Sequence, residues 1–237
     1  MFVPVHDINP LKRLPFQWVT VSLIAINILG YLVFGTLFFS PADEYAIDFA
    51  LIPQELVSDE PSLISMFRTR EPLPFPEWVT VFTYMFVHVN FLHLAGNMTF
   101  LWVFGDNVED AMGRWRFLFF YLSCGAAAGV VHTVLLQGSE MPVIGASGAV
   151  SGIIAAYLML HPNVRIWVLA LYRIPLRITA AIVVIVWLGL QVYYAVTDTA
   201  EVVAWEAHLA GFAVGLVLVC FLRQPGVPLF DRTISKV

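Results

Sequence analysis

Long apolar stretches recur along this chain, and they limit its fold more than any other feature. A helix needs about 20 mostly apolar residues to cross the roughly 30 Å hydrocarbon core of a bilayer. Six stretches meet this requirement, at residues 18–39, 90–108, 117–136, 143–160, 178–196 and 203–222. Because 59% of the residues are hydrophobic and only 12% are charged, a single water-soluble core could not bury them. The sequence therefore predicts an all-α bundle of six transmembrane helices.

The predicted helices form one unit. No internal repeat or Gly/Ser linker divides the chain, so residues 1–237 are predicted to be a single membrane domain, with a short N-terminal segment at 1–15 and a C-terminal tail at 223–237. Cys124 and Cys220 both lie within apolar stretches, which is typical of small buried side chains and not of a metal or disulfide site. We expect no cofactor, no metal and no nucleic-acid partner, and the lipid bilayer as the surrounding medium.

The distribution of positive charge predicts the orientation. Cytoplasmic loops of membrane proteins carry an excess of lysine and arginine. With six spans both termini share one side, and that side would hold every lysine and arginine except Arg68 and Arg70. The opposite side would hold most of the acidic residues. Both termini are therefore predicted to be cytoplasmic.

The connection between the first two spans is long. Its prolines alternate with other residues at 72–76, and this spacing does not allow a regular helix. Trp78 follows, and indole rings prefer the boundary between lipid and water. We predict that this loop rests in the membrane interface, with a fully solvated loop as the alternative.

Polar residues interrupt three of the apolar stretches. His93 and Asn97 lie four residues apart, on one face of the second span, while Ser147 lies near the outer end of the fourth and His208 near the outer end of the sixth. All three spans enter from the same side, so these residues should share one depth in the outer half of the membrane. Alone, such a serine would usually bond its own helix, and the others would bond neighbouring helices. Together they favour a functional site.

Small residues surround two of these positions. Gly-Ala-Ser-Gly at 145–148 would let backbone amides approach a ligand near the start of a helix, where negative charge is stabilised. Gly211 and Gly215 follow His208 at a spacing that allows helices to approach closely. Helix packing is the simpler interpretation of these glycines. Close packing would also bring His208 within reach of Ser147.

Three motifs at these positions resemble the rhomboid family of intramembrane serine proteases. The residues 145–148 are similar to its Gly-x-Ser-Gly motif. Ala-His-Leu-Ala-Gly at 207–211, with Gly215, resembles the motif around its catalytic histidine. Residues 88–98, which run from His88 through His-Leu-Ala-Gly-Asn-Met at 93–98, resemble its second-span motif. The motifs lie on the expected spans, in the expected order. The resemblance covers roughly residues 14–222.

The resemblance implies a role for each polar residue. Ser147 would be the nucleophile and His208 its general base, because a hydroxyl attacks poorly until an imidazole accepts its proton. His93, Asn97 and the backbone amide of Ser147 would bind the oxyanion. No acidic residue shares this layer convincingly, since Glu206 points to another helix face than His208, so a dyad is expected.

The resemblance also implies a substrate and a setting. The chain would be a serine endopeptidase that cleaves single-span transmembrane proteins in or near their membrane segment. We expect a prokaryotic plasma membrane, with the active site opening to the outer face. The fifth span, at 178–196 with Trp187, would be the movable wall for substrate access, together with the segment ending at Trp78.

Two positions depart from the family pattern. Ser151 stands where some members carry an aromatic residue beneath the histidine, and Trp78-Val79 stands where others carry Trp-Arg. The first leaves the orientation of His208 open, and the second leaves open how the external loop is anchored.

Other functions fit less well. No His-Glu-x-x-His zinc motif and no pair of intramembrane aspartates supports another class of protease. A non-catalytic, client-binding relative of the family is one alternative, and a transporter or channel is another, lined by His88, His93, His132 and His208.

Overall fold

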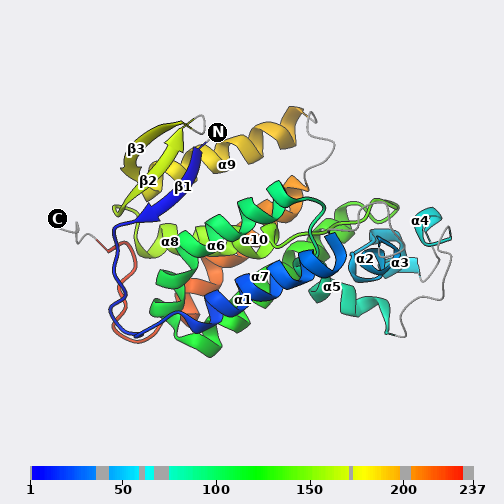
Figure 1. The fold of residues 1–237 in the computed structure, drawn as a ribbon, viewed down its shortest axis with the longest axis horizontal. Helices are drawn as coiled ribbons and strands as arrows, with labels where there is room; N and C mark the ends of the chain where they lie inside the picture. The colour runs from blue at the N-terminus through cyan, green and yellow to red at the C-terminus, as the bar shows by residue number, and fades with distance from the viewer. Residues whose placement is uncertain are drawn as a thin grey trace.

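The computed structural model describes residues 2–35, 43–58, 62–66, 75–170, 173–197 and 204–231. Within this part of the chain, an apolar helix lies at each of the predicted stretches (Figure 1). These helices are α1 (Trp18–Gly30), continued by the π-helix η1 (Tyr31–Gly35), α6 (Phe91–Met112), α7 (Arg114–Leu135), α8 (Ser147–Leu160), α9 (Ala180–Thr197) and α10 (Trp205–Leu222). The predicted helical membrane bundle is confirmed.

Not every helix is long enough to cross a bilayer alone. Among the described residues, α7, α9 and α10 meet the length and composition of a membrane span. A fourth span would be the pair formed by residues 77–86 and α6, which bend by 81° where they meet. The helices α1 and α8 are apolar but shorter. The count of six spans therefore stays a prediction.

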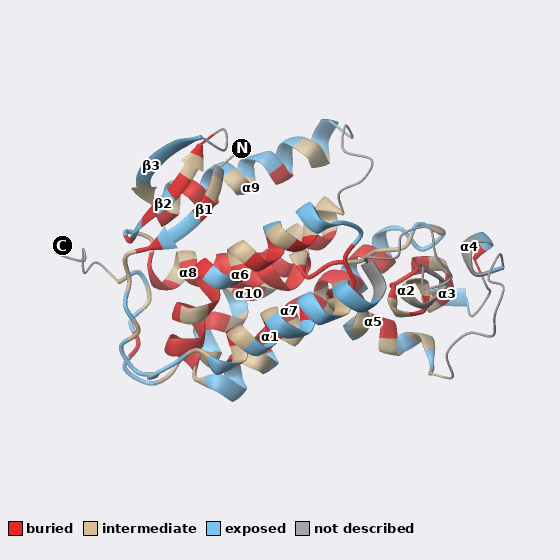
Figure 2. Cartoon of the chain, viewed as in Figure 1, coloured by how far each residue is buried: buried red, intermediate tan, exposed pale blue. Residues whose placement is uncertain are grey.

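Helix α8 is the centre of the bundle. It packs against α6, α7 and α10, and nearly all of its side chains are buried. Its 14 residues span about 21 Å at 1.5 Å per residue, which is less than the roughly 30 Å of a hydrocarbon core. Because most of its side chains are buried, neighbouring helices rather than lipid surround it. Figure 2 shows the contrast with α1 and α9, whose surfaces are largely exposed or half-buried. These outer apolar faces are the ones that lipid would cover.

Glycines bring α8 and α10 into backbone contact. A Cβ atom on Gly211 would overlap the carbonyl oxygen of Gly148, and one on Gly215 would overlap that of Gly152. Only glycine leaves this space, and small residues at such spacing are how membrane helices approach closely. The packing interpretation of these glycines is thus correct, and the same packing positions the start of both helices.

A three-stranded antiparallel sheet, in the order β1-β2-β3, accompanies the helical bundle and was not expected from the sequence. Strand β1 (Phe2–Asp7) pairs with β2 (Arg165–Ala170), and β2 pairs with β3 (Ile174–Thr179). The sheet lies beside one end of α9 (Figure 1). Residues 178 and 179, which the hydropathy pattern assigned to the fifth span, belong to β3 because their backbone pairs with β2.

The fourth predicted span also begins later than its apolar stretch. Val143 forms a backbone bridge with Leu51, and Gly145 has a φ of 114°, so the chain is not helical there. Helix α8 starts at Ser147 itself. An apolar stretch could not reveal this, since an extended buried segment and a helix have the same hydropathy.

The long connection between the first two spans is partly helical. It contains α2 (Asp43–Phe49), α3 (Pro53–Ser58), α4 (Leu63–Met66), η2 (Glu77–Val79), α5 (Thr80–Thr83) and η3 (Tyr84–Phe86). The backbone amide of Gln54 donates to Ser139 O, and Tyr84 Oη donates to Gly125 O, which joins this connection to the loop after α7 and to the middle of α7. Residues 72–74 of the proline-rich segment lie outside the described residues, and the interfacial position of the loop stays a prediction.

Two carboxylates at the end of α6 hold the N-terminal segment. Asp110 accepts hydrogen bonds from the backbone amides of Lys12, Arg13 and Leu14, at 3.0, 2.8 and 2.6 Å. Glu109 accepts from the amide and hydroxyl of Thr20, both at 2.8 Å, in the first turn of α1. The bonds to Glu109 satisfy amides that the start of α1 leaves unpaired, and the bonds to Asp110 satisfy amides of the segment before it. They explain why acidic residues occur at the end of α6, just after the apolar stretch 90–108.

Asp7, at the end of β1, makes the stability of this region depend on pH. Burial, opposed in part by a 2.5 Å hydrogen bond from Tyr157 Oη, raises the pKa of Asp7 to about 7. An unfolded aspartate titrates near 4. Between these values the folded chain holds a proton that the unfolded chain lacks, so the free energy of unfolding falls as pH rises through this window.

We therefore expect the melting temperature of the detergent-solubilised protein to fall between pH 5 and pH 8 by more in the wild type than in Asp7→Asn. Thermal unfolding at a series of pH values measures this difference. Equal pH dependence in the two proteins would contradict the assignment to Asp7.

Candidate active site

Ser147 is placed by a sharp turn before α8. Gly145 donates its backbone amide to Tyr84 O at 2.9 Å and adopts the positive φ that glycine tolerates. A Cβ atom at this position would approach Cε1 of the His93 ring to 2.5 Å, so a larger residue would collide with that ring. Ser147 is then the first residue of α8, where backbone amides lack helical partners.

His208 faces this serine. It lies in the first turn of α10, and its Nε2 is hydrogen-bonded to Ser147 Oγ at 2.8 Å. The glycine contacts between α8 and α10 begin one residue after Ser147, at Gly148, and hold the two helix starts together. The structure thus brings together the two residues that the sequence analysis paired.

His93 and Asn97 lie on the other side of the serine turn. Asn90 Oδ1 accepts the backbone amide of His93 at 2.8 Å and so caps the start of α6. The amide nitrogen of Asn97 would lie 3.6 Å from a Cβ atom on Gly145, next to the His93 ring. Both side chains therefore adjoin the backbone just before Ser147.

His88 is a member of this cluster to which the sequence analysis assigned no role in catalysis, although it begins the second-span motif. It is buried, and its Nε2 accepts hydrogen bonds from Asn97 Nδ2 at 3.0 Å and from the backbone amide of Ala146 at 3.5 Å. Its ring centroid lies 5.1 Å from that of His93. His88 precedes α6, so helical spacing gave no signal for it.

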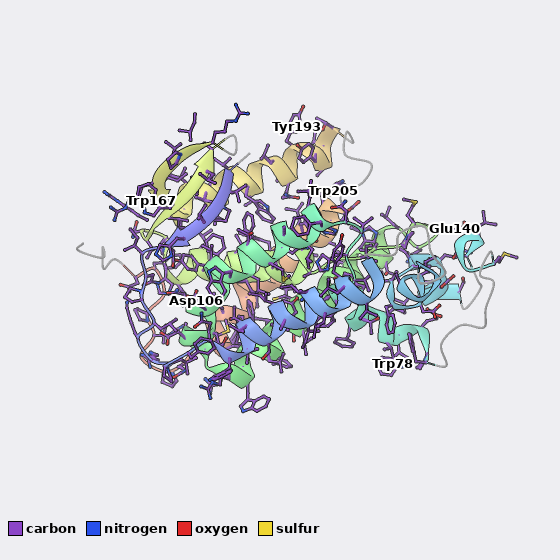
Figure 3. All side chains as sticks on the ribbon, in the orientation of Figure 1. Trp78, Asp106, Glu140, Trp167, Tyr193 and Trp205 are labelled. Atoms are coloured by element: carbon purple, nitrogen blue, oxygen red, sulfur yellow. The ribbon has the colours of Figure 1, made fainter. Side chains whose placement is uncertain are left out.

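The two residues predicted for substrate access lie in different places. Trp187, on α9, has its ring centroid 6.2 Å from that of His208 and 6.0 Å from that of Phe212. Trp78 is exposed on η2, away from Trp205 at the start of α10 (Figure 3). Only Trp187 is therefore brought next to the serine–histidine pair.

A polar residue of α9 also reaches His208. Gln191 Oε1 lies 2.9 Å from His208 Nδ1, and its side chain is buried. Glu206 instead contacts His132, with Oε2 3.6 Å from Nδ1. Gln191 was missed because a single glutamine in an apolar span carries no motif. Its strong polarity within the fifth span was the one available signal.

Comparison of the sequence with known proteins identifies the family of this chain. The sequence matches the profile of the Rhomboid domain over residues 76–225, which is more than half of the chain. The chain belongs to the rhomboid family. The matched region contains the cluster around Ser147 and all of α6, α7, α8, α9 and α10.

Individual rhomboid proteins are also similar to this chain in sequence. The chain is 30% identical over 168 residues to Rhomboid-like protein 11, chloroplastic, of Arabidopsis thaliana, covering 68% of this chain and 59% of that protein. It is 30% identical over 157 residues to Rhomboid protease GluP of Bacillus subtilis, covering 66% of this chain and 28% of that protein. The human Presenilin-associated rhomboid-like protein, mitochondrial, is 29% identical over 144 residues, which are 57% of this chain and 36% of that protein.

These relatives support a broad assignment for this rhomboid. The chain is a multi-pass integral membrane protein, and its family supports an intramembrane protease type of function. The chain spans less than two thirds of the length of each of these relatives. Two of them carry chloroplastic or mitochondrial in their names, so the expectation of a prokaryotic membrane is not supported.

Proposed function

We propose that this rhomboid is a serine endopeptidase that cleaves transmembrane proteins in or near their membrane segment. The observation that carries the proposal is the 2.8 Å hydrogen bond between Ser147 Oγ and His208 Nε2, at the adjoining starts of α8 and α10. A nucleophile and a base within hydrogen-bond distance are the minimal arrangement for covalent hydrolysis.

The proposed reaction has two stages. His208 takes the proton of Ser147 as the hydroxyl attacks the carbonyl carbon of the substrate, and returns it to the amine that leaves. The acyl group is then on Ser147 Oγ. Water attacks this ester with His208 again as the base, which releases the acid product and restores the serine.

The cluster beside Ser147 is suited to the negative charge that forms on the carbonyl oxygen. The amide group of Asn97 carries two hydrogens, so it can donate one to His88 and a second to the oxyanion. His93 and the Ser147 backbone amide would complete the set. Because Asn97 is buried and its partner His88 is fixed, the donor needs little reorganisation during the reaction.

Asn97→Ala should therefore lower kcat by roughly 10²–10³-fold, the usual scale for one oxyanion donor, with little change in KM. Steady-state cleavage of a transmembrane reporter in proteoliposomes measures both constants. Thr99→Ala, on the same helix, is the matched control and should retain activity. An effect of Asn97→Ala on KM alone would make Asn97 a binding residue instead.

Access for the substrate is proposed to run past α9. Outside its packing against α8, α10 and β3, this helix exposes an apolar face, and its Trp187 lies beside His208. A transmembrane substrate approaches from lipid, so displacement of α9 would open the shortest route to the serine. We also propose that both termini are cytoplasmic and that the site opens to the outer face, as the lysine and arginine distribution predicts.

Covalent labelling tests the proposed function directly. A fluorophosphonate probe should label the wild-type protein in detergent and fail to label Ser147→Ala, because the probe reacts only with an activated serine. Ser123→Ala, which alters a serine of α7, is the matched control and should be labelled normally. A wild-type protein that is folded but not labelled would favour the non-catalytic, client-binding alternative.

A further inference from the structure

Both ring nitrogens of His208 have a partner. Nε2 is hydrogen-bonded to Ser147 Oγ at 2.8 Å, and Nδ1 is hydrogen-bonded to Gln191 Oε1 at 2.9 Å. The imidazole is therefore held from two helices, α8 and α9, although it belongs to a third. An imidazole fixed at both nitrogens has one orientation and one arrangement of its protons.

Ser151, at the position on α8 where some rhomboids carry an aromatic residue beneath the histidine, does not contact His208 through its hydroxyl. Ser151 Oγ donates to the backbone oxygen of Ser147 at 2.6 Å, so it turns toward its own helix. Glu206, the acidic residue nearest to His208 in sequence, contacts His132. Within the part of the chain that the structure describes, Gln191 is the side chain that is hydrogen-bonded to Nδ1 of His208.

The chemistry of the Gln191 contact selects a tautomer. A carboxamide oxygen can only accept a hydrogen bond, so Nδ1 of His208 must carry the hydrogen. In a neutral imidazole, Nε2 then has a free lone pair, which is the form that accepts the proton of the Ser147 hydroxyl. With the opposite tautomer, Nε2 would donate to Ser147 and could not act as a base.

Burial strengthens this contact. The side chain of Gln191 is only 8% exposed, so water competes little for its oxygen. The ring of Trp187, one turn earlier on α9, covers the same histidine at a centroid distance of 6.2 Å. Helix α9 therefore supplies both a polar and an aromatic contact to His208.

We propose that Gln191 is the positioning residue of the site: its carboxamide oxygen holds His208 with the hydrogen on Nδ1, so that Nε2 is free to activate Ser147. The inference rests on the proposed function of the serine–histidine pair. Gln191 takes the part that an acid has in a catalytic triad, with a neutral group in place of a carboxylate. Because Gln191 lies on α9, the pair is fully ordered only while α9 packs against α8 and α10 (Figure 1).

The test compares substitutions that differ in whether residue 191 can accept a hydrogen bond. Gln191→Met keeps the length of the side chain and removes the acceptor, while Gln191→Glu keeps the acceptor and cannot donate when ionised. Leu188→Met, one turn away on α9, is the matched packing control. For each full-length protein in detergent, we would measure the rate of fluorophosphonate labelling, kcat and KM for a transmembrane reporter, and the melting temperature.

Gln191→Met should lower the labelling rate and kcat together, by roughly 10- to 100-fold, with KM and melting temperature little changed. Gln191→Glu should restore labelling to within a few-fold of the wild type. The small probe reacts at the serine without a transmembrane segment having to pass α9, so a slower labelling rate reports on the serine–histidine pair and not on access.

Three results would overturn the inference. Labelling of Gln191→Met at the wild-type rate would show that Gln191 merely packs α9, and a change confined to KM would assign it to substrate access. Labelling of Gln191→Glu as slow as that of Gln191→Met would show that the acceptor oxygen is not what matters. A wild-type protein that is never labelled would instead refute the proposed function, and this inference with it.

Discussion

Replacement of His208 by alanine should reduce hydrolysis of a transmembrane reporter by at least about 10⁴-fold, the scale on which serine hydrolases lose activity when their base is removed. The imidazole is the group that contacts Ser147 Oγ, at 2.8 Å, so it is the side chain placed to take the proton directly. The change should leave the fold intact, since His208 is only partly buried and the α8–α10 contact depends on glycines. Reporter cleavage in proteoliposomes and thermal unfolding measure the two effects.

A histidine far from the site provides the control. His6, exposed on β1, can be replaced by alanine without touching the cluster, and this variant should cleave at the wild-type rate. Retained cleavage in a folded His208→Ala protein would contradict the dyad. The companion variant Ser147→Ala should be equally inactive, and the double variant should lose no more than either single one, because the two residues act as a unit.

The second large effect is expected at Gly211, which contacts no reacting atom. A Cβ atom there would overlap the carbonyl oxygen of Gly148, one residue after Ser147, so Gly211→Ala must push α8 and α10 apart. Displacement by about 1 Å at a catalytic pair costs roughly 10²-fold in rate. We expect kcat/KM to fall by that factor or more, and overpacking to lower the free energy of unfolding by about 1–3 kcal/mol.

The control for Gly211→Ala is another helical glycine. A Cβ built on Gly96, on α6, would meet no other part of the protein within 4 Å, so Gly96→Ala should leave activity unchanged and should not lower stability. Reporter kinetics and thermal unfolding of the two alanine variants, side by side, check the comparison. Normal activity in Gly211→Ala would mean that the helices can relax around the added methyl group without moving Ser147 from His208.

Several of these features could be predicted from the sequence for a clear physical reason. Hydropathy is a local property, so each apolar stretch indicated its helix, and the alternation of spans placed His93, Ser147 and His208 at one depth. The glycines near Ser147 and His208 indicated close packing, because only small residues let membrane helices touch. The pairing of Ser147 with His208 followed from depth and packing together.

Contacts between distant segments were beyond local patterns. The sheet joins residues 2–7 to 165–179, and neither β1 nor its partner β2 can be recognised as half of that pair from its own sequence neighbourhood. The acidic residues Glu109 and Asp110 directly follow the second apolar stretch, and the structure explains them by showing that they bind the backbone of residues 12–20. Their partners lie about ninety residues away in the sequence, so a local hydrophobic period could not predict these contacts.

The orientation of His208 shows most clearly which features the sequence predicts and which features depend on the tertiary structure. The sequence predicted that an imidazole would meet a serine hydroxyl near the outer ends of two spans, from their shared depth, the glycine spacing and the resemblance to rhomboid motifs. Only the tertiary structure decided that Gln191, on α9, meets the other ring nitrogen at 2.9 Å. Which side chain reaches Nδ1 depends on how α9 rotates and leans against α10, and that is set by packing among helices rather than by any one of them.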